Sequence, residues 1–120
     1  LERLAGHDLL TQLRRILRTL VMTSDCSLVV AARHAGMHGR TLNRRLADHG
    51  TSFLELREEA RRELACQLLE STSKPANEVA VTLGYTDASS FTRAFKRWTG
   101  MGPQAWRASL RAGARKAKRS

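Results

Sequence analysis

Two short basic clusters contain the side chains of this sequence that are best suited to bind an anion. Each lies in a stretch without acidic residues, the first with Arg40, Arg44 and Arg45 and the second with Arg93, Lys96 and Arg97. A guanidinium group pairs with phosphate oxygens, and it can also donate two hydrogen bonds to O6 and N7 of guanine. The clusters therefore predict a polyanionic partner, and composition leaves nucleic acid and an anionic membrane surface both open.

The cysteine and histidine residues lack the spacing that catalysis or metal binding requires. Cys26 and Cys66 form neither a Cys-x-x-Cys pair nor a paired metal-ligand spacing, which argues against a disulfide framework and a zinc site. His34 and His38 lie four residues apart, but Gly36 ends the predicted helix between them and no third ligand is near. We expect no metal, no cofactor and no enzymatic activity, and we expect both cysteines to pack as small apolar groups.

The charge of the chain is large and unevenly distributed. The formal net charge is +10, and residues 107–120 carry six positive charges and no negative ones, which leaves +4 for residues 1–106. No apolar run approaches the ~20 residues of a membrane span, and no signal-peptide pattern opens the chain. We therefore expect no membrane association and a cytoplasmic, nucleoid-associated location. Because the first residue is Leu1 rather than Met, we expect that a tag or a whole domain has been removed.

The spacing of apolar residues predicts helices, and these helices must position the basic clusters. Apolar side chains recur every three or four residues, Ser27, Ser52 and Asp87 are placed to cap helix starts, and Gly36 is placed to make a tight turn. The predicted helices span residues 8–21, 28–35, 39–49, 53–70, 76–83, 88–99 and 104–110. Since no segment alternates with period two, we predict an all-α fold without a sheet.

The step Ala-x-x-x-Gly occurs twice, from Ala32 to Gly36 and from Ala80 to Gly84, 48 residues apart. In each copy a small Ala lets a second helix cross close over the first, and the Gly makes the turn between them, as in a helix-turn-helix. The predicted helix over residues 53–70 joins the two copies and is about 27 Å long. Recognition helices at its ends would lie near ~34 Å apart, the distance between successive major-groove segments of B-DNA.

Several motifs in residues 27–107 resemble the AraC/XylS family of bacterial regulators. They are Gly39-Arg-Thr-Leu-Asn-Arg-Arg-Leu46, Gly50-Thr-Ser-Phe53, Leu83-Gly-Tyr-Thr-Asp87, Ser89-Ser-Phe-Thr-Arg-Ala-Phe-Lys-Arg-Trp-Thr-Gly100 and Gly102-Pro103. The resemblance implies two helix-turn-helix subdomains, about seven helices in all, joined by a long central linker helix and binding double-stranded promoter or operator DNA. It also implies RNA polymerase as a partner and an N-terminal sensor and dimerisation domain outside this chain. The operator, the effector ligand and the choice between activation and repression stay open.

The resemblance also assigns roles to individual residues of the two recognition helices. Base edges are assigned to Arg40, Asn43 and Arg44 in the first helix and to Ser89, Thr92 and Arg93 in the second. Phosphates are assigned to Arg45, Ser52, Lys96, Arg97 and Gln104. Backbone N–H groups at the helix starts near Ser52 and Gln104 suit an anion, which supports the second assignment. Arg44 and Arg93 could contact a phosphate instead of a base, and Asn43 could face water.

The expected organisation follows from the repeat and the resemblance. It comprises an N-terminal helix in residues 1–22, a first helix-turn-helix in 23–50, a linker helix in 51–71, a second helix-turn-helix in 72–110 and a basic disordered tail in 111–120. His38 stands where the family usually has a Ser cap, and Ala31 and Ala35 replace larger aliphatic residues, so we expect looser packing in the first unit. The tail should add salt-sensitive, sequence-independent attraction to DNA.

Three other functions fit parts of the sequence. DNA-alkylation repair proteins carry a similar two-unit domain beside a methyl-accepting cysteine, but neither Cys26 nor Cys66 lies in a basic metal-binding cluster. A non-specific architectural protein would bind DNA by charge alone. Aromatic residues can stack on single-stranded bases, but the helical spacing of Phe91, Phe95 and Trp98 predicts that they form a core.

Overall fold

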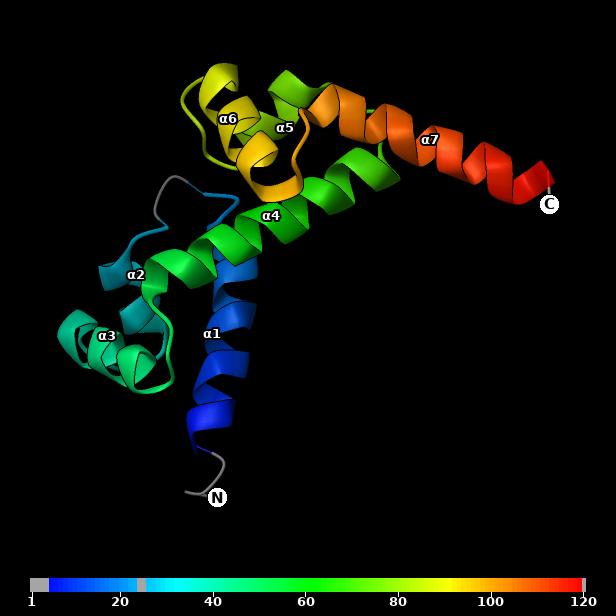
Figure 1. Cartoon of the computed structure of the whole chain (residues 1–120). Coiled ribbons are helices and arrows are strands. Elements are labelled where there is room, and N and C mark those ends of the chain that lie inside the picture. Colours follow the sequence, from blue (N-terminus) through cyan, green and yellow to red (C-terminus); the bar gives the residue numbers. More distant parts are fainter. Residues whose placement is uncertain (1–4, 24–25, 120) are drawn as a thin grey trace. The chain divides into compact units, whose positions relative to one another are not determined.

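The structure, a computed structural model, describes the backbone of residues 5–23 and 26–119 and the side chains of residues 8–23 and 26–113. Within these ranges every regular element is a helix (Figure 1). The helices are α1 (Ala5–Leu20), α2 (Leu28–His34), α3 (Gly39–Asp48), α4 (Phe53–Ser71), α5 (Ala76–Thr82), α6 (Ala88–Thr99) and α7 (Pro103–Arg119). The predicted all-α fold with two helix-turn-helix subdomains is confirmed.

The chain divides into two compact units, Leu1–Arg61 and Arg62–Ser120, and the long helix α4 begins in the first and ends in the second. In the first unit α2 packs against both α1 and α3, which form one body with the start of α4 (Figure 1). The core is aliphatic apart from one aromatic ring and one thiol, and it consists of Leu9, Leu13, Leu17, Leu20, Val21, Cys26, Ala31, Ala32, Leu42, Leu46, Phe53, Leu56 and Ala60.

Polar contacts on the surface of the first unit join its helices. Arg14 of α1 pairs with Glu59 of α4, with 3.4 Å between the guanidinium Nε and a carboxylate oxygen. The guanidinium of Arg57 lies 5.8 Å from the centre of the Phe53 ring, and its Nη1 donates to the backbone carbonyl of Cys26 at 3.5 Å. These contacts bind the start of α4 to α1 and to the loop before α2.

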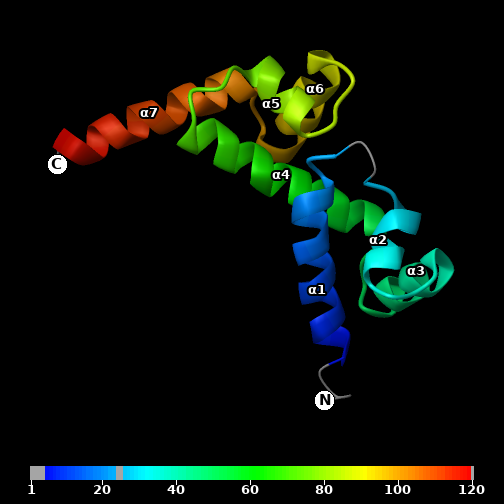
Figure 2. The ribbon, with the colours of Figure 1, turned by 180° about the vertical axis from the view of Figure 1, so that it is seen from behind.

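Aromatic packing dominates the second unit, where α6 packs against both α5 and α7, and Figure 2 shows these three helices together. The buried cluster contains Ala65, Leu69, Val79, Ala80, Leu83, Phe91 and Phe95, with Tyr85, Trp98 and Trp106 packed against it. Phe95 contacts three other rings, with centroid separations of 5.8 Å to Phe91, 6.1 Å to Trp98 and 5.5 Å to Trp106. Tilted and edge-to-face geometries of this kind add stability beyond the burial of apolar area. The aromatic residues are therefore core residues, as predicted.

The predicted helix starts and turns agree with the observed backbone. The Ser27 hydroxyl accepts a hydrogen bond from the Val30 N–H at 3.3 Å, and the Ser52 hydroxyl accepts one from the Glu55 N–H at 3.2 Å. Gly36 and Gly84 have φ angles of +75° and +84°. Residues with a side chain rarely adopt such angles, so both helix-turn-helix turns depend on these glycines. The Glu55 carboxylate accepts a further hydrogen bond at this helix start, from the Thr51 hydroxyl at 3.0 Å.

The buried face of α4 differs from the stripe that regular periodicity predicts. A four-residue step from Ala60 along the helix predicts that Leu64 and Leu68 are buried. Instead Ala65 and Leu69 are buried, and Leu64 and Leu68 are only half-buried. The buried positions advance by five residues instead of four at the point where α4 passes from one unit to the other. A helix that serves two separate cores does not keep one continuous apolar stripe.

The last helix is longer than predicted. We expect a short helix over residues 104–110 followed by a disordered tail, whereas α7 continues to Arg119. Nine of the twelve residues in 108–119 are Ala, Arg or Lys, which favour helix, and positive charge near a helix C-terminus interacts favourably with the helix dipole. Helix propensity therefore outweighs the repulsion among like charges in this segment.

Candidate nucleic-acid interface

The outward face of α3 carries three of the predicted base-contacting residues. Leu42 and Leu46 are fully buried, whereas Arg40, Asn43 and Arg44 are exposed. At about 100° per residue, the three polar residues lie roughly 100° to 200° around the helix from Leu42, so they share one face. This face can present two guanidinium groups and one carboxamide to a single ligand, which is the donor and acceptor set that recognises base edges.

The outward face of α6 has the same arrangement. Phe91 and Phe95 are fully buried, and Ser89, Thr92 and Arg93 are exposed on the opposite side. The prediction that Phe91 and Phe95 are core residues is therefore confirmed, and Arg93 faces outward. The hydroxyl groups of this face can each donate and accept, whereas the guanidinium only donates.

A hydrogen-bond network surrounds the start of α6. The Asp87 carboxylate accepts from the Ser90 N–H at 2.7 Å through Oδ1 and from the Ser90 hydroxyl at 3.2 Å through Oδ2. The Ser90 hydroxyl oxygen in turn accepts from Nη2 of Arg93 at 3.4 Å. The hydrogen bond from the Ser90 backbone N–H, with smaller contributions from the Ser90 hydroxyl and the charge of Arg93, holds the pKa of the Asp87 carboxyl below its ordinary value.

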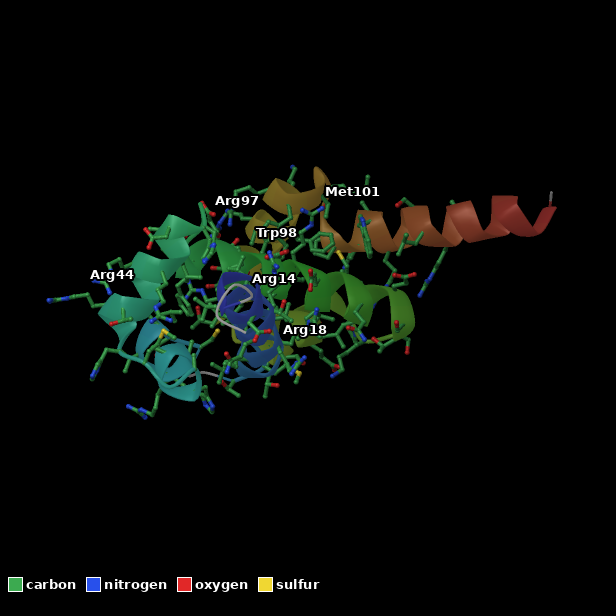
Figure 3. The ribbon with its side chains drawn as sticks, turned by 90° about the horizontal axis from the view of Figure 1, so that it is seen from below. Arg14, Arg18, Arg44, Arg97, Trp98 and Met101 are labelled. Atoms are coloured by element: carbon green, nitrogen blue, oxygen red, sulfur yellow. The ribbon has the colours of Figure 1, made fainter. Side chains whose placement is uncertain are left out.

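The start of α3 lacks such a network. His38 occupies the N-cap position with extended backbone angles, but its side chain makes no capping hydrogen bond. Among the described residues, neither the Thr41 hydroxyl nor the Arg44 guanidinium has a hydrogen-bond partner. Figure 3 shows the Arg44 side chain extended away from α3 into open space.

The predicted phosphate-contacting residues lie in varied surroundings. Arg45 on α3, Lys96 and Arg97 on the last turns of α6, and Gln104 in the first turn of α7 are exposed. The Ser52 side chain is half-buried and already caps α4, so the remaining N–H groups of that helix start are the donors open to an anion. Gln104 and Thr92 line the same surface depression of about 480 Å³ in the second unit, between the starts of α5 and α7.

Nucleophilic and metal chemistry have little support in the structure. Burial raises the pKa of the Cys26 thiol, an effect that Arg61 and Arg57 partly oppose, and burial likewise raises the pKa of the Cys66 thiol. Both groups are therefore protonated and weakly nucleophilic at neutral pH. Within the described residues, no group of three or more His, Cys, Asp or Glu side chains could hold a metal ion. None of the described helices combines the length and the apolar character that a membrane crossing requires.

Two features of the structure were not anticipated from the sequence. Ser90 lies at the centre of the network around Asp87, and the Asp-x-x-Ser spacing at a helix start was a signal for it. Arg107 has no assigned role in the sequence prediction, but its Nε donates to the Leu69 carbonyl at 2.9 Å and its Nη2 to the Thr72 carbonyl at 3.3 Å. It therefore satisfies backbone carbonyls at and just beyond the C-terminal end of α4.

Comparison with known proteins gives consistent results. The helix-turn-helix domain family matches residues 31–109. The ornithine utilization regulator of Pseudomonas aeruginosa is 41% identical over 102 residues, which cover 84% of this chain and 30% of the regulator. A DNA-binding transcriptional dual regulator from Escherichia coli K-12 superposes with a TM-score of 0.77 at 25% identity, covering 84% of this chain and 96% of that one.

A second solved structure was determined with nucleic acid bound. It is the DNA-binding domain of the global transcriptional factor AdpA in complex with a target DNA, with a TM-score of 0.74 at 27% identity, covering 86% of this chain and 93% of that one. The chain spans less than a third of the length of these curated relatives. It covers 30% of the ornithine utilization regulator and 26% of the regulator VqsM of Pseudomonas aeruginosa.

Proposed function

Because the chain belongs to the AraC/XylS-type helix-turn-helix family, we propose that it is the DNA-binding part of a bacterial transcription regulator and recognises a specific duplex through α3 and α6. The observation that carries the proposal is the pair of exposed polar faces on these two helices, each backed by buried residues. Each helix follows a tight glycine turn, which is the geometry that inserts a recognition helix into the major groove.

Within each face we assign base contacts to the residues nearest the helix start. These are Arg40, Asn43 and Arg44 on α3, and Ser89, Thr92 and Arg93 on α6. Arg suits guanine and Asn suits adenine, whereas Ser and Thr hydroxyls bond to several bases and discriminate less. These residues occupy the second, fifth and sixth positions of each helix, which supports this assignment, because the N-terminal part of a recognition helix contacts base edges.

Phosphate contacts surround the two faces. We assign them to Arg45, Lys96, Arg97, Gln104 and the backbone at Ser52. Lys96 follows Thr92 by four residues and so lies one turn further along the same side of α6, where the backbone flanks the groove. The basic end of α7 adds attraction to any duplex. In this proposal each unit binds one segment of the major groove, and the two segments lie on successive turns of the DNA.

Several properties of the whole regulator follow from the same proposal. The relatives are much longer than this chain, which supports an N-terminal sensor and dimerisation domain in the complete protein. RNA polymerase is the further partner that a promoter-bound regulator requires. Because chromosomal DNA is the ligand, the site of action is the cytoplasm, at the nucleoid.

We assign no enzymatic activity to the chain. A methyl-accepting repair function needs an accessible thiolate, and burial raises the pKa of both the Cys26 and Cys66 thiols. Both thiols therefore stay protonated at neutral pH, which disfavours their attack on an alkyl group.

The test is a binding titration with the protein as it stands. We select duplexes from a random pool, then compare affinity for the selected duplex with affinity for its scrambled sequence, at several salt concentrations. We expect a preference of about 10³-fold or more. The logarithm of affinity should fall with the logarithm of salt at a slope of about −3 or steeper, since three Lys or Arg side chains are assigned to phosphates.

A matched variant separates specific contacts from charge. Replacing Arg44 and Arg93 with Ala removes two positive charges from the proposed faces, and replacing Arg15 and Arg18 removes two from the exposed side of α1. The first variant should relax the sequence preference, whereas the second should keep it. Equal affinity for selected and scrambled DNA would identify an architectural binder instead, and no binding to any duplex at low salt would contradict the proposal altogether.

A further inference from the structure

The Arg93 guanidinium is held by its own helix before any DNA is present. Its Nη2 lies 3.4 Å from the Ser90 hydroxyl oxygen, three residues earlier, so the side chain leans toward the N-terminal end of α6. Long side chains on a helix point in this direction, which is the end that a recognition helix inserts into the groove. The guanidinium has five N–H donors, and this contact engages one of them. Two donors on one edge remain for O6 and N7 of guanine.

The direction of the hydrogen bonds in this group is fixed. A hydroxyl has a single proton, and the Ser90 hydroxyl directs it to Oδ2 of Asp87, with 3.2 Å between the two oxygens. The lone pairs of the Ser90 oxygen are therefore the part that faces Arg93. Donation to a carboxylate makes the hydroxyl oxygen a stronger acceptor, because neighbouring hydrogen bonds polarise one another.

Asp87 is itself immobilised by the backbone. Its Oδ1 accepts from the Ser90 N–H at 2.7 Å, which is the N-cap bond of α6. The same bond holds the pKa of the Asp87 carboxyl below its ordinary value, so the group is charged at neutral pH. The Asp87 carboxylate therefore has two roles. It caps the N-terminal end of α6, and it provides a fixed oxygen atom to which the Ser90 hydroxyl donates.

The corresponding positions of α3 contain no such group. His38 stands in the place of Asp87, Thr41 in the place of Ser90 and Arg44 in the place of Arg93. The His38 side chain makes no capping bond, and among the described residues the Thr41 hydroxyl and the Arg44 guanidinium make no side-chain hydrogen bond. Arg44 must therefore be ordered by the DNA itself, at an entropic cost that Arg93 has already met in part.

We propose that Asp87 and Ser90 are positioning residues that orient Arg93 for base recognition, and that they make the second helix-turn-helix the more stringent of the two. The inference rests on the proposed function, since it assumes that Arg93 contacts a base. Neither Asp87 nor Ser90 needs to touch the DNA, because both act through the guanidinium. The consequence is a strict preference at the base pair that Arg93 contacts and a looser one at the base pair that Arg44 contacts.

The test uses Ser90→Ala, which removes the hydroxyl but keeps the backbone N–H that Asp87 caps. Ala also favours helix, so α6 stays folded, as circular dichroism will verify. Affinity is measured for a selected duplex, for its single-base-pair variants and for scrambled DNA. We expect Ser90→Ala to reduce discrimination at the base pair of Arg93 by about threefold to tenfold, the equivalent of ordering one flexible side chain. Affinity for scrambled DNA should stay within about twofold, since phosphate contacts are untouched.

Two further variants exclude a merely structural effect. Ser90→Thr restores a hydroxyl, and Thr is accepted at the equivalent position of α3, so discrimination should return. Thr41→Ala is the matched control, because it removes a hydroxyl without a hydrogen-bond partner among the described residues, and it should change discrimination at no base pair. In an Arg93→Ala background, Ser90→Ala should have no further effect on discrimination.

The outcomes separate the inference from the function on which it rests. If Arg93→Ala relaxes one base pair and Ser90→Ala does not, the positioning role is wrong and base recognition by Arg93 stands. If Ser90→Ala still weakens binding in the Arg93→Ala background, Ser90 contacts the DNA itself and the positioning role is again wrong. If Arg93→Ala changes no base preference, the assignment of Arg93 fails and the inference fails with it.

Discussion

The two helix-turn-helix units share one backbone plan and differ in what supports it. In the first unit α3 packs through Leu42 and Leu46 onto a core of small and aliphatic side chains, and His38 leaves its start without a side-chain cap. In the second, α6 packs through Phe91 and Phe95 into an aromatic cluster, and Asp87 caps its start. The same motif is therefore supported by a different core and a different helix cap in each unit.

Charge does not distinguish the two recognition helices. Each carries three basic residues, Arg40, Arg44 and Arg45 on α3 and Arg93, Lys96 and Arg97 on α6. Charge attracts any duplex, and a fixed donor geometry selects among duplexes. The comparison therefore places the difference between the two units in the hydrogen bond that orients Arg93, and not in the number of charges.

The largest expected effect concerns the difference between the two cores. Phe95→Ala removes a ring that contacts three others and should lower the free energy of unfolding by about 3–5 kcal/mol. Leu46→Ala, the equivalent change in α3, should cost about 2–5 kcal/mol with no loss of ring contacts. Urea unfolding is followed by Trp fluorescence and by circular dichroism.

The two probes make this a test of the comparison. Both tryptophans of the chain, Trp98 and Trp106, lie in the second unit, so fluorescence reports that unit while circular dichroism reports both. Phe95→Ala should move the fluorescence midpoint more than Leu46→Ala does. Identical shifts of both probes in both variants would mean that the two units unfold as one cooperative body, and the distinction between two cores would then have no thermodynamic meaning.

The next effect compares the two outward arginines. Arg93→Ala should cost about 1–3 kcal/mol on the selected duplex and relax preference at one base pair. Arg44→Ala should weaken binding with a smaller change in preference, because its guanidinium makes no side-chain hydrogen bond among the described residues. Lys96→Ala, a phosphate contact, should weaken all duplexes about equally. Titration against single-base-pair variants distinguishes these patterns, and an unchanged preference in Arg93→Ala would make Arg93 a phosphate contact.

Much of this architecture could be predicted from the sequence because local signals agree with the final packing. Ser27, Ser52 and Asp87 cap the helices that they were expected to cap, and the helix over residues 39–48 was predicted to within one residue. Gly36 and Gly84 mark both turns, since a positive φ there favours Gly. The outward positions of Arg44 and Arg93 follow from helical periodicity and the burial of their neighbours.

The remaining features depend on distances that periodicity does not encode. The shift to Ala65 and Leu69 along α4 arises because that helix contributes to two cores. The role of Arg107 could not be predicted because its acceptors, the carbonyls of Leu69 and Thr72, lie more than thirty residues away in the sequence. The position of Ser90 was clear from the sequence, but its bond to Arg93 depends on the rotamers of both side chains. The DNA contacts themselves stay predictions.

Acid should affect the two recognition helices differently. The pKa of the Asp87 carboxyl is lowered in the folded state, so its stabilising contribution is complete above the pKa of the unfolded chain and is lost as pH falls through the lower folded pKa. The cap position of α3 carries no carboxylate. Trp fluorescence during urea unfolding should therefore show a loss of stability below about pH 4 that Asp87→Asn reduces. An identical acid dependence in Asp87→Asn would mean that other carboxylates dominate.

The smallest expected effect is the addition of a cap to α3. The backbone of His38 already has extended N-cap angles, φ −81° and ψ 153°, close to those of Ser27 at the capped start of α2. His38→Ser should therefore place a hydroxyl oxygen near the Thr41 N–H without moving the chain. The expected gain is about 0.5–1 kcal/mol, measured by urea unfolding and by slower hydrogen exchange at the Thr41 amide. If His38→Ser raises stability and leaves discrimination at the Arg44 base pair unchanged, the stability of the helix start alone does not set selectivity. The difference between the two units then lies in the orientation of the Arg93 guanidinium, which Arg44 lacks.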